Sequence, residues 1–312
     1  MFARRTLSTI AVLLLAGASA WYSISIGSFV PLAFLSLVVL FLSFLESVSF
    51  VTGRRIAKTL LFFSCCCVFA SITLLSDGPA TPTVQALVTL PVPALMAGLL
   101  GVLLFLAANA MFWFSLDYRK SAAEVGWFYI VFVYYALLAP LIFRVMLFPN
   151  YIVWDPSLGR WASPDHAIAA GVYFFLGSVL VAKFTDIGAY LGGLMLGRKL
   201  FGGRKMAPRI SPKKTMAGLL FGVLTAVVAG FLFLYLNPFG RFHVAILILF
   251  GPLVGFLTIG GDLMESVFKR SFNLKDSGAT LPGIGGVFDL TDSLFWAVPG
   301  AYALFLLNFW LV

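Results

Sequence analysis

Charged residues are scarce in this sequence, and their scarcity excludes a soluble globular fold. Asp, Glu, Lys and Arg together make up 11% of the 312 residues, whereas 61% of the residues are hydrophobic and the mean hydropathy is +1.03. A soluble domain of this length could not hide so much apolar surface in one core. The composition therefore predicts an integral membrane protein.

Histidine and cysteine are also rare, which limits the chemistry that the chain can carry. The two histidines, His166 and His243, fall in loops that the topology below places outside, so histidine acid/base catalysis is not expected on the cytoplasmic face. The three cysteines, Cys65, Cys66 and Cys67, are adjacent within an apolar run and lack the spacing of a zinc site. We interpret them as small packing residues.

Long apolar runs are what the sequence has in abundance. A helix needs about 20 residues to cross a hydrocarbon layer roughly 30 Å thick, and nine runs come close to or exceed that length. We therefore expect an all-α fold, a polytopic membrane helix bundle of about nine transmembrane helices. The runs are Leu7–Ile26, Phe29–Phe50, Thr59–Leu75, Val84–Ser115, Trp127–Phe148, Ala167–Ala182, Met216–Leu236, Val244–Leu263 and Ser293–Val312.

The distribution of positive charge orients this bundle. With the N-terminus in the cytoplasm, alternate loops place all but three of the 21 Lys and Arg residues inside, the exceptions being Arg144, Arg160 and Arg241. This bias follows the positive-inside rule and favours an odd number of spans. The net charge of +9 reflects these loops and their affinity for anionic lipid headgroups, so nucleic acid is not expected as a partner. The first run follows two arginines, as in a signal peptide, and we interpret it as an uncleaved helix.

The two halves of the chain differ in where ionisable residues gather. No long linker, low-complexity tract or fixed-period repeat divides the sequence, so we expect one membrane domain. Within it, residues 1–166 form the N-terminal transmembrane helices. Residues 167–312 form a C-terminal transmembrane region whose ionisable residues concentrate on the cytoplasmic side, and this region is the candidate catalytic part.

The first polar segment of that region lies between residues 183 and 215. Asp186 and Tyr190 share a helical face, and Gly188 and Gly192 form a small-residue pair that allows close helix contact. A loop rich in Lys and Arg follows, and its end, SPKKT at 211–215, directly precedes an apolar helix. A helix N-terminus with adjacent lysines and hydroxyls can bind a polyphosphate, whereas a topogenic loop would only touch lipid headgroups. This segment alone leaves both interpretations open.

The second polar segment begins at the end of the eighth apolar run. Asp262, Glu265, Ser266 and Lys269 stand at positions i, i+3, i+4 and i+7 of a helix, so all four point to one side. Mg²⁺ prefers carboxylate oxygens and commonly bridges protein to substrate phosphates, so the segment predicts a metal-nucleotide site. The alternative is a set of internal salt bridges at the membrane edge. The glycine-rich turn and its flanks add Lys275, Asp276, Pro282, Gly283, Gly285, Gly286, Asp289 and Asp292.

These residues resemble the signature pattern of the phosphatidate cytidylyltransferases, also called CDP-diacylglycerol synthases. The pattern begins with Ser, continues with Lys-Arg and Lys-Asp, and closes on Gly-Gly and a pair of Asp. Two positions depart from it, because Ile284 stands in place of His and Leu290 in place of Arg. The resemblance covers roughly residues 183–292. The matching positions are Ser266, Lys269, Arg270, Lys275, Asp276, Gly278, Leu281, Pro282, Gly285, Gly286, Asp289 and Asp292, with Asp186, Ala189, Tyr190, Ser211–Thr215, Gly218, Asp262 and Glu265 upstream.

The resemblance implies a Mg²⁺-dependent nucleotidyltransferase that converts CTP and phosphatidate to CDP-diacylglycerol and pyrophosphate in phospholipid biosynthesis. It implies CTP, phosphatidate and membrane lipids as partners, a possible homodimer, and a place in the cell (inner) membrane with the active site on the cytoplasmic side. Asp262, Asp276 and Asp289 would hold the metal, and Lys213 and Lys214 would neutralise the triphosphate. The expected catalytic residues are Asp262, Lys269, Arg270, Lys275, Asp276 and Asp289, and the expected substrate-binding residues are Asp186, Ser211, Lys213, Lys214, Ser266, Gly285, Gly286 and Asp292.

Two other classes of function are alternatives. A CTP-dependent polyprenol or phytol-type lipid kinase would use a similar nucleotide site at the membrane edge, but it would transfer the γ-phosphoryl group to an alcohol. A non-catalytic transporter or lipid-binding membrane protein would tolerate Ile284 and Leu290 more easily. Its ionisable residues should line a path near the bilayer midplane, whereas those of this chain gather at one surface.

Overall fold

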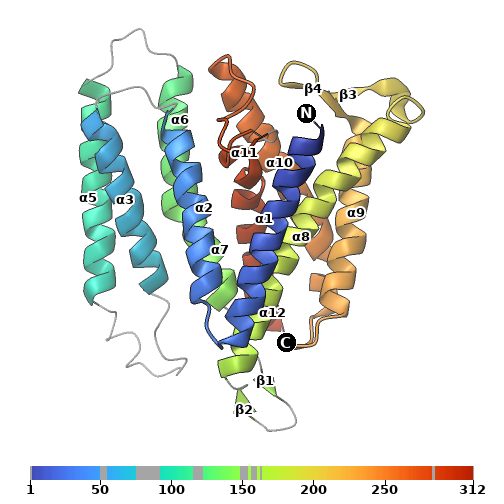
Figure 1. Cartoon of the computed structure of the whole chain (residues 1–312), viewed down its shortest axis with the longest axis horizontal. Coiled ribbons are helices and arrows are strands. Elements are labelled where there is room, and N and C mark those ends of the chain that lie inside the picture. The colour runs from blue at the N-terminus through green and yellow to red at the C-terminus, as the bar shows by residue number, and fades with distance from the viewer. Residues whose placement is uncertain are drawn as a thin grey trace. The chain divides into compact units, whose positions relative to one another are not determined.

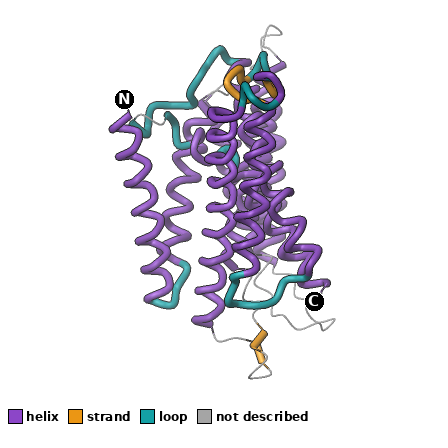
Figure 2. Tube along the Cα trace, turned by 90° about the vertical axis from the view of Figure 1, so that its right-hand side faces the viewer, coloured by secondary structure: helices purple, strands orange, loops and turns teal. Residues whose placement is uncertain are grey.

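A computed structural model describes residues 2–49, 55–74, 92–114, 122–147, 154–155, 160–161, 164–282 and 285–311. Helices dominate the described chain, and the few strands are short (Figure 2). The all-α fold predicted from the sequence is therefore confirmed. The helices are α1 (Phe2–Ser25), α2 (Val30–Ser49), α3 (Arg55–Leu74), α5 (Val92–Phe114), α6 (Ala122–Phe132), α7 (Ala139–Leu147), α8 (Pro164–Leu196), α9 (Met216–Tyr235), α10 (Val244–Ser271), α11 (Phe288–Thr291) and α12 (Leu294–Leu311). The strands are β1 (Trp154–Asp155), β2 (Arg160–Trp161), β3 (Lys205–Ala207) and β4 (Ser211–Thr215).

Six helices of the described chain are long and apolar enough to cross a membrane. This finding fits the predicted polytopic membrane protein. The count of nine spans and the cytoplasmic N-terminus stay predictions. The six segments are Val30–Ser49, Glu124–Met146, Ile168–Leu196, Met216–Tyr235, Val244–Ser271 and Phe288–Asn308, and two shorter apolar helices are Ala57–Ala70 and Met96–Phe112.

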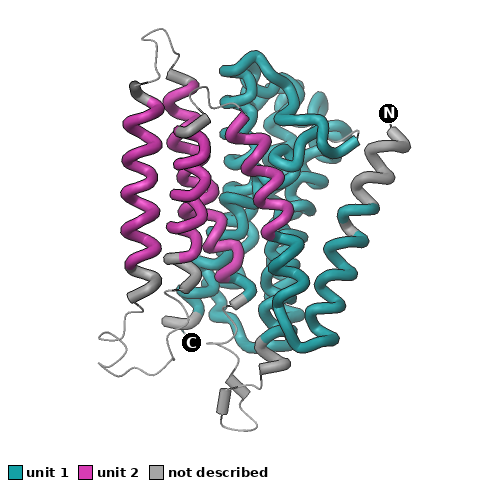
Figure 3. Tube along the Cα trace, turned by 60° about the vertical axis from the view of Figure 1, so that its left-hand side comes forward, with its two compact units in different colours: residues 1–36, 145–312 teal, residues 37–144 magenta. Residues whose placement is uncertain are grey.

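The chain folds into two compact units (Figure 3). Unit 1 consists of Met1–Ser36 and Val145–Val312, and unit 2 consists of Leu37–Arg144. The division of the sequence at residue 166 rested on loop chemistry rather than on packing, and it stays a prediction. Every polar residue proposed for the site belongs to unit 1.

Unit 2 is tied together by hydrogen bonds between neutral groups. The Ser64 hydroxyl of α3 donates to the Gly101 carbonyl of α5 at 2.7 Å. The indole N–H of Trp127 on α6 donates to the Ser47 carbonyl of α2 at 2.7 Å. Between α6 and α7 the chain forms a π-helical segment, Val133–Leu138. Hydroxyl and indole groups in an apolar setting need such partners, and small or neutral residues commonly supply them between membrane helices.

Glycines bring α8, α9 and α10 of unit 1 close together (Figure 1). A Cβ atom on Gly188 would collide with the side chain of Thr225, and one on Gly192 would collide with Phe221. The small-residue pair of α8 thus packs against α9, as its spacing predicts. On α10, a Cβ atom on Gly251 would meet the backbone of α9. These contacts pack α9 against α8 and α10, the two helices that carry charged residues of the candidate site.

A β-hairpin joins α8 to α9 and sets the start of α9. Strand β3 pairs with β4 in antiparallel fashion, and β4 leads directly into the helix. The Thr215 hydroxyl accepts the Gly218 N–H at 3.0 Å and so caps α9. From α10, the Arg270 guanidinium donates to the Ile210 carbonyl at 3.5 Å and to the Leu274 carbonyl at 3.0 Å. The hairpin is therefore held beside the C-terminal end of α10.

The chain between α10 and α12 turns back onto α10. Leu281 and Gly285 exchange backbone hydrogen bonds of 2.9 and 3.1 Å. Gly285 has φ +126°, a conformation that glycine adopts readily and other residues avoid. The short helix α11 follows, and Phe288 and Phe295 are buried at 1% and 0% exposure on either side of the junction with α12. The junction lies against α10, because a Cβ atom on Gly261 would approach the Asp292 carbonyl oxygen to 3.0 Å.

Candidate functional site

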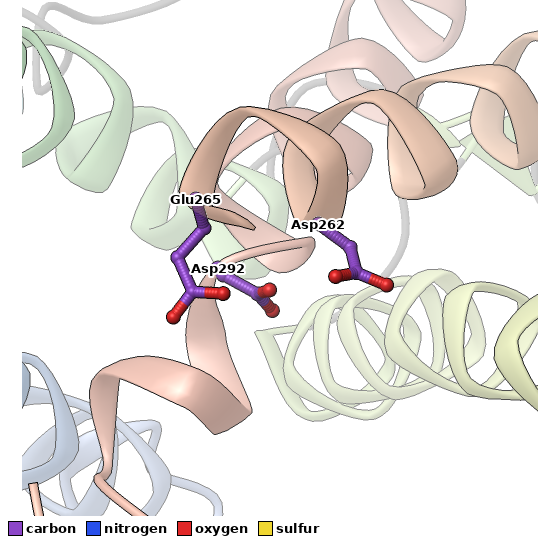
Figure 4. Close-up of side chains that lie close together, drawn as sticks. All are labelled: Asp262, Glu265 and Asp292. Carbon is purple, nitrogen blue, oxygen red and sulfur yellow. The ribbon is translucent and has the colours of Figure 1, made fainter. Parts of the chain in front are cut away.

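Three carboxylates from two parts of unit 1 point toward one another (Figure 4). Asp262 and Glu265 stand on α10, and Asp292 stands at the junction of α11 and α12. One oxygen from each carboxylate lies within 4.8 Å of the others. Gly261 permits this approach, because a Cβ atom there would lie 3.0 Å from the Asp292 carbonyl oxygen and 3.1 Å from the Ser293 Cα. We call Asp262, Glu265 and Asp292 the carboxylate group.

The burial of the carboxylate group indicates a cation. Glu265 is 1% exposed and Asp292 is 5% exposed. No described residue forms a hydrogen bond with Glu265 Oε1, although this atom is buried. A buried anionic oxygen without a partner is costly, and three carboxylates so close together repel one another. Oxygen donors of this kind are those that Mg²⁺ and Ca²⁺ prefer, so the residues present fit a hard divalent cation.

Lys269 and Asp289 extend the carboxylate group toward the glycine-rich turn. Lys269 Nζ lies 2.8 Å from Glu265 Oε2 and 3.0 Å from Asp289 Oδ1. The Asp289 carboxylate also accepts the Ser277 N–H at 3.0 Å and the Gly286 N–H at 2.9 Å. Charge-assisted bonds of this kind are stronger than neutral ones. Asp289 therefore anchors the turn and at the same time balances the positive charge of Lys269.

Lys214 brings a second positive charge to the carboxylate group. It is the residue before the α9 cap, and its Nζ lies 2.6 Å from Asp262 Oδ2. The contact is an ion pair by distance, although its angles do not make it a hydrogen bond. The start of α9 is also a region of positive potential, because the first N–H groups of a helix and its dipole point there. Lys214 and Asp262 thus join the hairpin to the carboxylate group.

Lys183 of α8 contacts the α11–α12 junction, where Asp292 stands. Its Nζ lies 3.5 Å from Asp186 Oδ2 and donates to the Leu290 carbonyl at 3.1 Å. It also lies 3.5 Å from the Ser293 hydroxyl. Asp186 is within electrostatic range of Asp262 and Lys214. Helices α8 and α10, strand β4 ahead of α9, and the α11–α12 junction therefore all contribute charged groups to one neighbourhood.

Most of the predicted site residues meet in this neighbourhood. Those that make the contacts described above are Asp186, Lys214, Asp262, Lys269, Gly285, Gly286, Asp289 and Asp292. The remaining predicted residues do not take part in those contacts. The side chains of Lys213, Lys275 and Asp276 are exposed, those of Ser211 and Ser266 are half-buried, and Arg270 bonds backbone carbonyls.

The carboxylate group differs in part from the metal ligands expected from the sequence. Of Asp262, Asp276 and Asp289, only Asp262 belongs to it. The oxygens of Asp289 are engaged by Lys269 and by two backbone N–H groups, and Asp276 is exposed. Metal binding by these two aspartates stays a prediction. Ile284, one of the two departures from the signature, lies outside the described residues.

Sequence reasoning did not single out Lys183. The pair of Lys183 with Asp186 could have been predicted, because residues three apart on one helix lie on the same face. The contact with Leu290 joins residues 107 positions apart, and no local pattern could have predicted it.

Comparisons with known proteins identify the family to which the chain is similar. The chain matches the model of the Cytidylyltransferase family over residues 3–308. It is 39% identical over 131 residues to a protein of Staphylococcus aureus named phosphatidate cytidylyltransferase. The aligned segment covers 41% of this chain and 47% of that protein. It is 36% identical over 132 residues to a protein of the same name from Haemophilus influenzae, covering 41% and 44% of the two chains.

The match to the curated relatives is partial, because the aligned segment spans about half of their length. The match to the family spans nearly the whole chain. The matched range includes the acidic and basic residues that the fold gathers around α10. On this ground the chain belongs to the cytidylyltransferase family.

Proposed function

We propose that the protein is a phosphatidate cytidylyltransferase, which forms CDP-diacylglycerol and pyrophosphate from CTP and phosphatidate in phospholipid biosynthesis. The proposal rests on the carboxylate group, in which Glu265 and Asp292 are buried and Asp262 is half-buried, and on Lys214 and Lys269 beside it. Such a pairing of acidic and basic groups suits a metal-bound triphosphate. The family match and the names of the curated relatives support the same reaction.

Asp262, Glu265 and Asp292 are the residues that would hold Mg²⁺. When bound, the metal would neutralise the charge of the triphosphate and bridge it to the protein. The sequence-based set of Asp262, Asp276 and Asp289 shares one member with this group. We favour the carboxylate group because it contains the buried oxygen of Glu265 that has no hydrogen-bond partner among the described residues.

The side chains of the site align two anionic substrates. Lys214, beside the N-terminus of α9, would bind the phosphates of CTP, with the exposed Lys213 next to it. Lys269, with Arg270 and Lys275 near it in sequence, would bind the phosphate of phosphatidate. Each cation offsets the repulsion between the substrates and holds them for in-line attack.

The chemistry requires no general base. An oxygen of phosphatidate, already anionic at neutral pH, attacks the α-phosphorus of CTP. A P–O bond forms to the lipid phosphate as the bond between the α-phosphorus and the α,β-bridging oxygen breaks. The electron pair leaves with pyrophosphate, and no proton is transferred. The scarcity of histidine is compatible with this reaction.

The membrane setting follows from the lipid substrate. The acyl chains would enter sideways from the bilayer while the phosphate reaches the charged residues of α8, β4 and α10. We place the protein in the cell (inner) membrane with its site on the cytoplasmic side, in accord with the bias of Lys and Arg. A homodimer remains part of the proposal.

An isotope experiment tests the reaction. The full chain, purified in detergent, is incubated with phosphatidate, Mg²⁺ and CTP labelled at either the α- or the γ-phosphate. We expect the α-label to enter the lipid phase only when both phosphatidate and Mg²⁺ are present. Transfer of the γ-label would instead reveal a lipid kinase. Failure to transfer either label would contradict the proposed function.

A further inference from the structure

Lys183 is a cation within a membrane-spanning helix that the reaction above does not use. A Lys at such a position is rare and needs a reason. Its side chain is 33% exposed, and its Nζ donates to the Leu290 carbonyl and contacts the Ser293 hydroxyl. Both partners lie at the α11–α12 junction, one on each side of Asp292 in sequence order. Lys183 therefore holds the backbone from which Asp292 projects.

The charges near Lys183 are predominantly negative. Asp186 lies 3.5 Å from its Nζ, and Asp292 is within electrostatic range of Lys183, Asp186 and Asp262. The other two buried or half-buried lysines of the site have their own partners, since Lys214 pairs with Asp262 and Lys269 pairs with Glu265 and Asp289. Lys183 is thus the cation placed to balance Asp186 and Asp292.

Leu290, whose carbonyl Lys183 contacts, is one of the two positions that depart from the signature pattern. The signature that the chain resembles has Arg there, and this chain has Leu290. The ammonium of Lys183 lies against the carbonyl of this same residue. We propose that Lys183 supplies, from the neighbouring helix, the positive charge that this chain lacks at position 290. In this role Lys183 is a positioning residue, which keeps Asp292 facing Asp262 and Glu265.

The inference rests on the proposed function, because it gives the carboxylate group the task of binding a divalent cation. Removing the charge of Lys183 should therefore have opposite effects on stability without metal and on affinity for a divalent cation. Removing the charge of Lys183 leaves Asp186 and Asp292 less well balanced, which lowers stability without metal. The same removal makes the site more negative, which favours a divalent cation. A residue that served only in packing would lower stability without tightening metal binding.

The first test is thermal stability in the absence of divalent cations. The full-length proteins in detergent are the wild type, Lys183→Met, Lys183→Arg and the double variant Lys183→Met/Leu290→Arg, with Lys199→Met as a control at an exposed lysine. We expect a lower melting temperature for Lys183→Met and recovery in both Lys183→Arg and the double variant. Should Lys183→Met fail to fold, a folded double variant supports the proposal. A double variant no more stable than Lys183→Met, or equally unable to fold, overturns it.

The second test is the Mg²⁺ concentration that gives half of the maximal thermal stabilisation. We expect this concentration to fall about fivefold in Lys183→Met, because an opposing charge has been removed. It should return to the wild-type value in the double variant. An unchanged or higher concentration in Lys183→Met would contradict the proposal. A wild type that does not respond to Mg²⁺ would instead refute the metal site of the proposed function, and the recovery of stability by Leu290→Arg would still decide the role of Lys183.

Discussion

Unit 2 and the C-terminal helices of unit 1 use polar side chains in different ways. In unit 2, the bonds of Ser64 and Trp127 join neutral groups to backbone carbonyls of neighbouring helices. In unit 1, Lys214, Lys269 and the carboxylate group bring full charges together at the ends of long apolar helices. Neutral bonds are enough to join helices in a membrane, where they contribute modestly. Buried charges cost more and are usually kept for function.

The comparison teaches where to look for activity in a chain that is mostly apolar. Helix packing accounts for the bonds of Ser64 and Trp127 in unit 2. Packing alone does not explain why Glu265 is buried beside two other carboxylates, with an oxygen that lacks a hydrogen-bond partner among the described residues.

Asp262→Asn should have the largest effect. It removes the charge that faces both Lys214 and the other carboxylates, so we expect CDP-diacylglycerol formation to fall at least about a hundredfold. The measurement is transfer of α-label from CTP to phosphatidate at matched protein and Mg²⁺ concentrations. Full activity in a folded Asp262→Asn protein would show that the charged groups of unit 1 do not serve the reaction, which would end the distinction from unit 2.

Gly261→Ala tests the approach of α10 to the α11–α12 junction. The added Cβ atom would lie 3.0 Å from the Asp292 carbonyl oxygen, so Asp292 should move relative to Asp262. We expect a loss of activity of about tenfold, since small displacements of aligned groups reduce rates strongly. Gly260→Ala is the matched control, because no described atom outside its own helical surroundings lies within 4 Å of a Cβ atom there. Equal losses in the two variants would show that helix composition, not the approach, matters.

Lys214→Gln should have a smaller effect, directed at the nucleotide. Loss of one charge-assisted contact with a phosphate should raise the KM for CTP about fivefold and change kcat less. Lys205→Gln, at an exposed position in the same hairpin, controls for the general loss of positive charge. If the KM for CTP rises equally in the two variants, the total positive charge of the hairpin matters and Lys214 makes no specific contact with the nucleotide.

Ser64→Ala should have the smallest effect. It deletes one neutral bond between α3 and α5 of unit 2, which should lower the free energy of unfolding by about 0.6 kcal/mol. Label transfer per folded molecule should match the wild type. A tenfold loss of transfer without unfolding would mean that unit 2 takes part in the reaction and would break the comparison.

Much of the fold could be predicted from the sequence, because apolar length and charge bias are local properties. The helical spacing of Asp262, Glu265 and Lys269 correctly put these residues on one side of α10. The sequence placed the end of the sixth span near residue 182, whereas α8 continues to Leu196. Asp186 and Lys183 therefore stand on the helix itself, because a half-buried ion pair lets the helix continue past its apolar part.

The membership of the carboxylate group could not be predicted, because it depends on how the chain returns to α10. Asp289 and Asp292 are three residues apart and look equivalent in the sequence. In the structure Asp289 is used by Lys269 and by the Ser277 and Gly286 N–H groups, whereas Asp292 faces Asp262. The backbone of the turn and the close approach at Gly261 make this difference, and neither is visible in residue spacing.

If the carboxylate group of unit 1 serves cytidylyl transfer rather than packing, Glu265→Gln should abolish most of the activity. Glutamine keeps the shape of the side chain and removes its charge. The measurement is α-label transfer from CTP to phosphatidate by the folded variant over a range of Mg²⁺ concentrations. The account predicts a rate at least about a hundredfold below that of the wild type at every Mg²⁺ concentration. A folded Glu265→Gln protein that transfers label at the wild-type rate, with the same dependence on Mg²⁺, would contradict it.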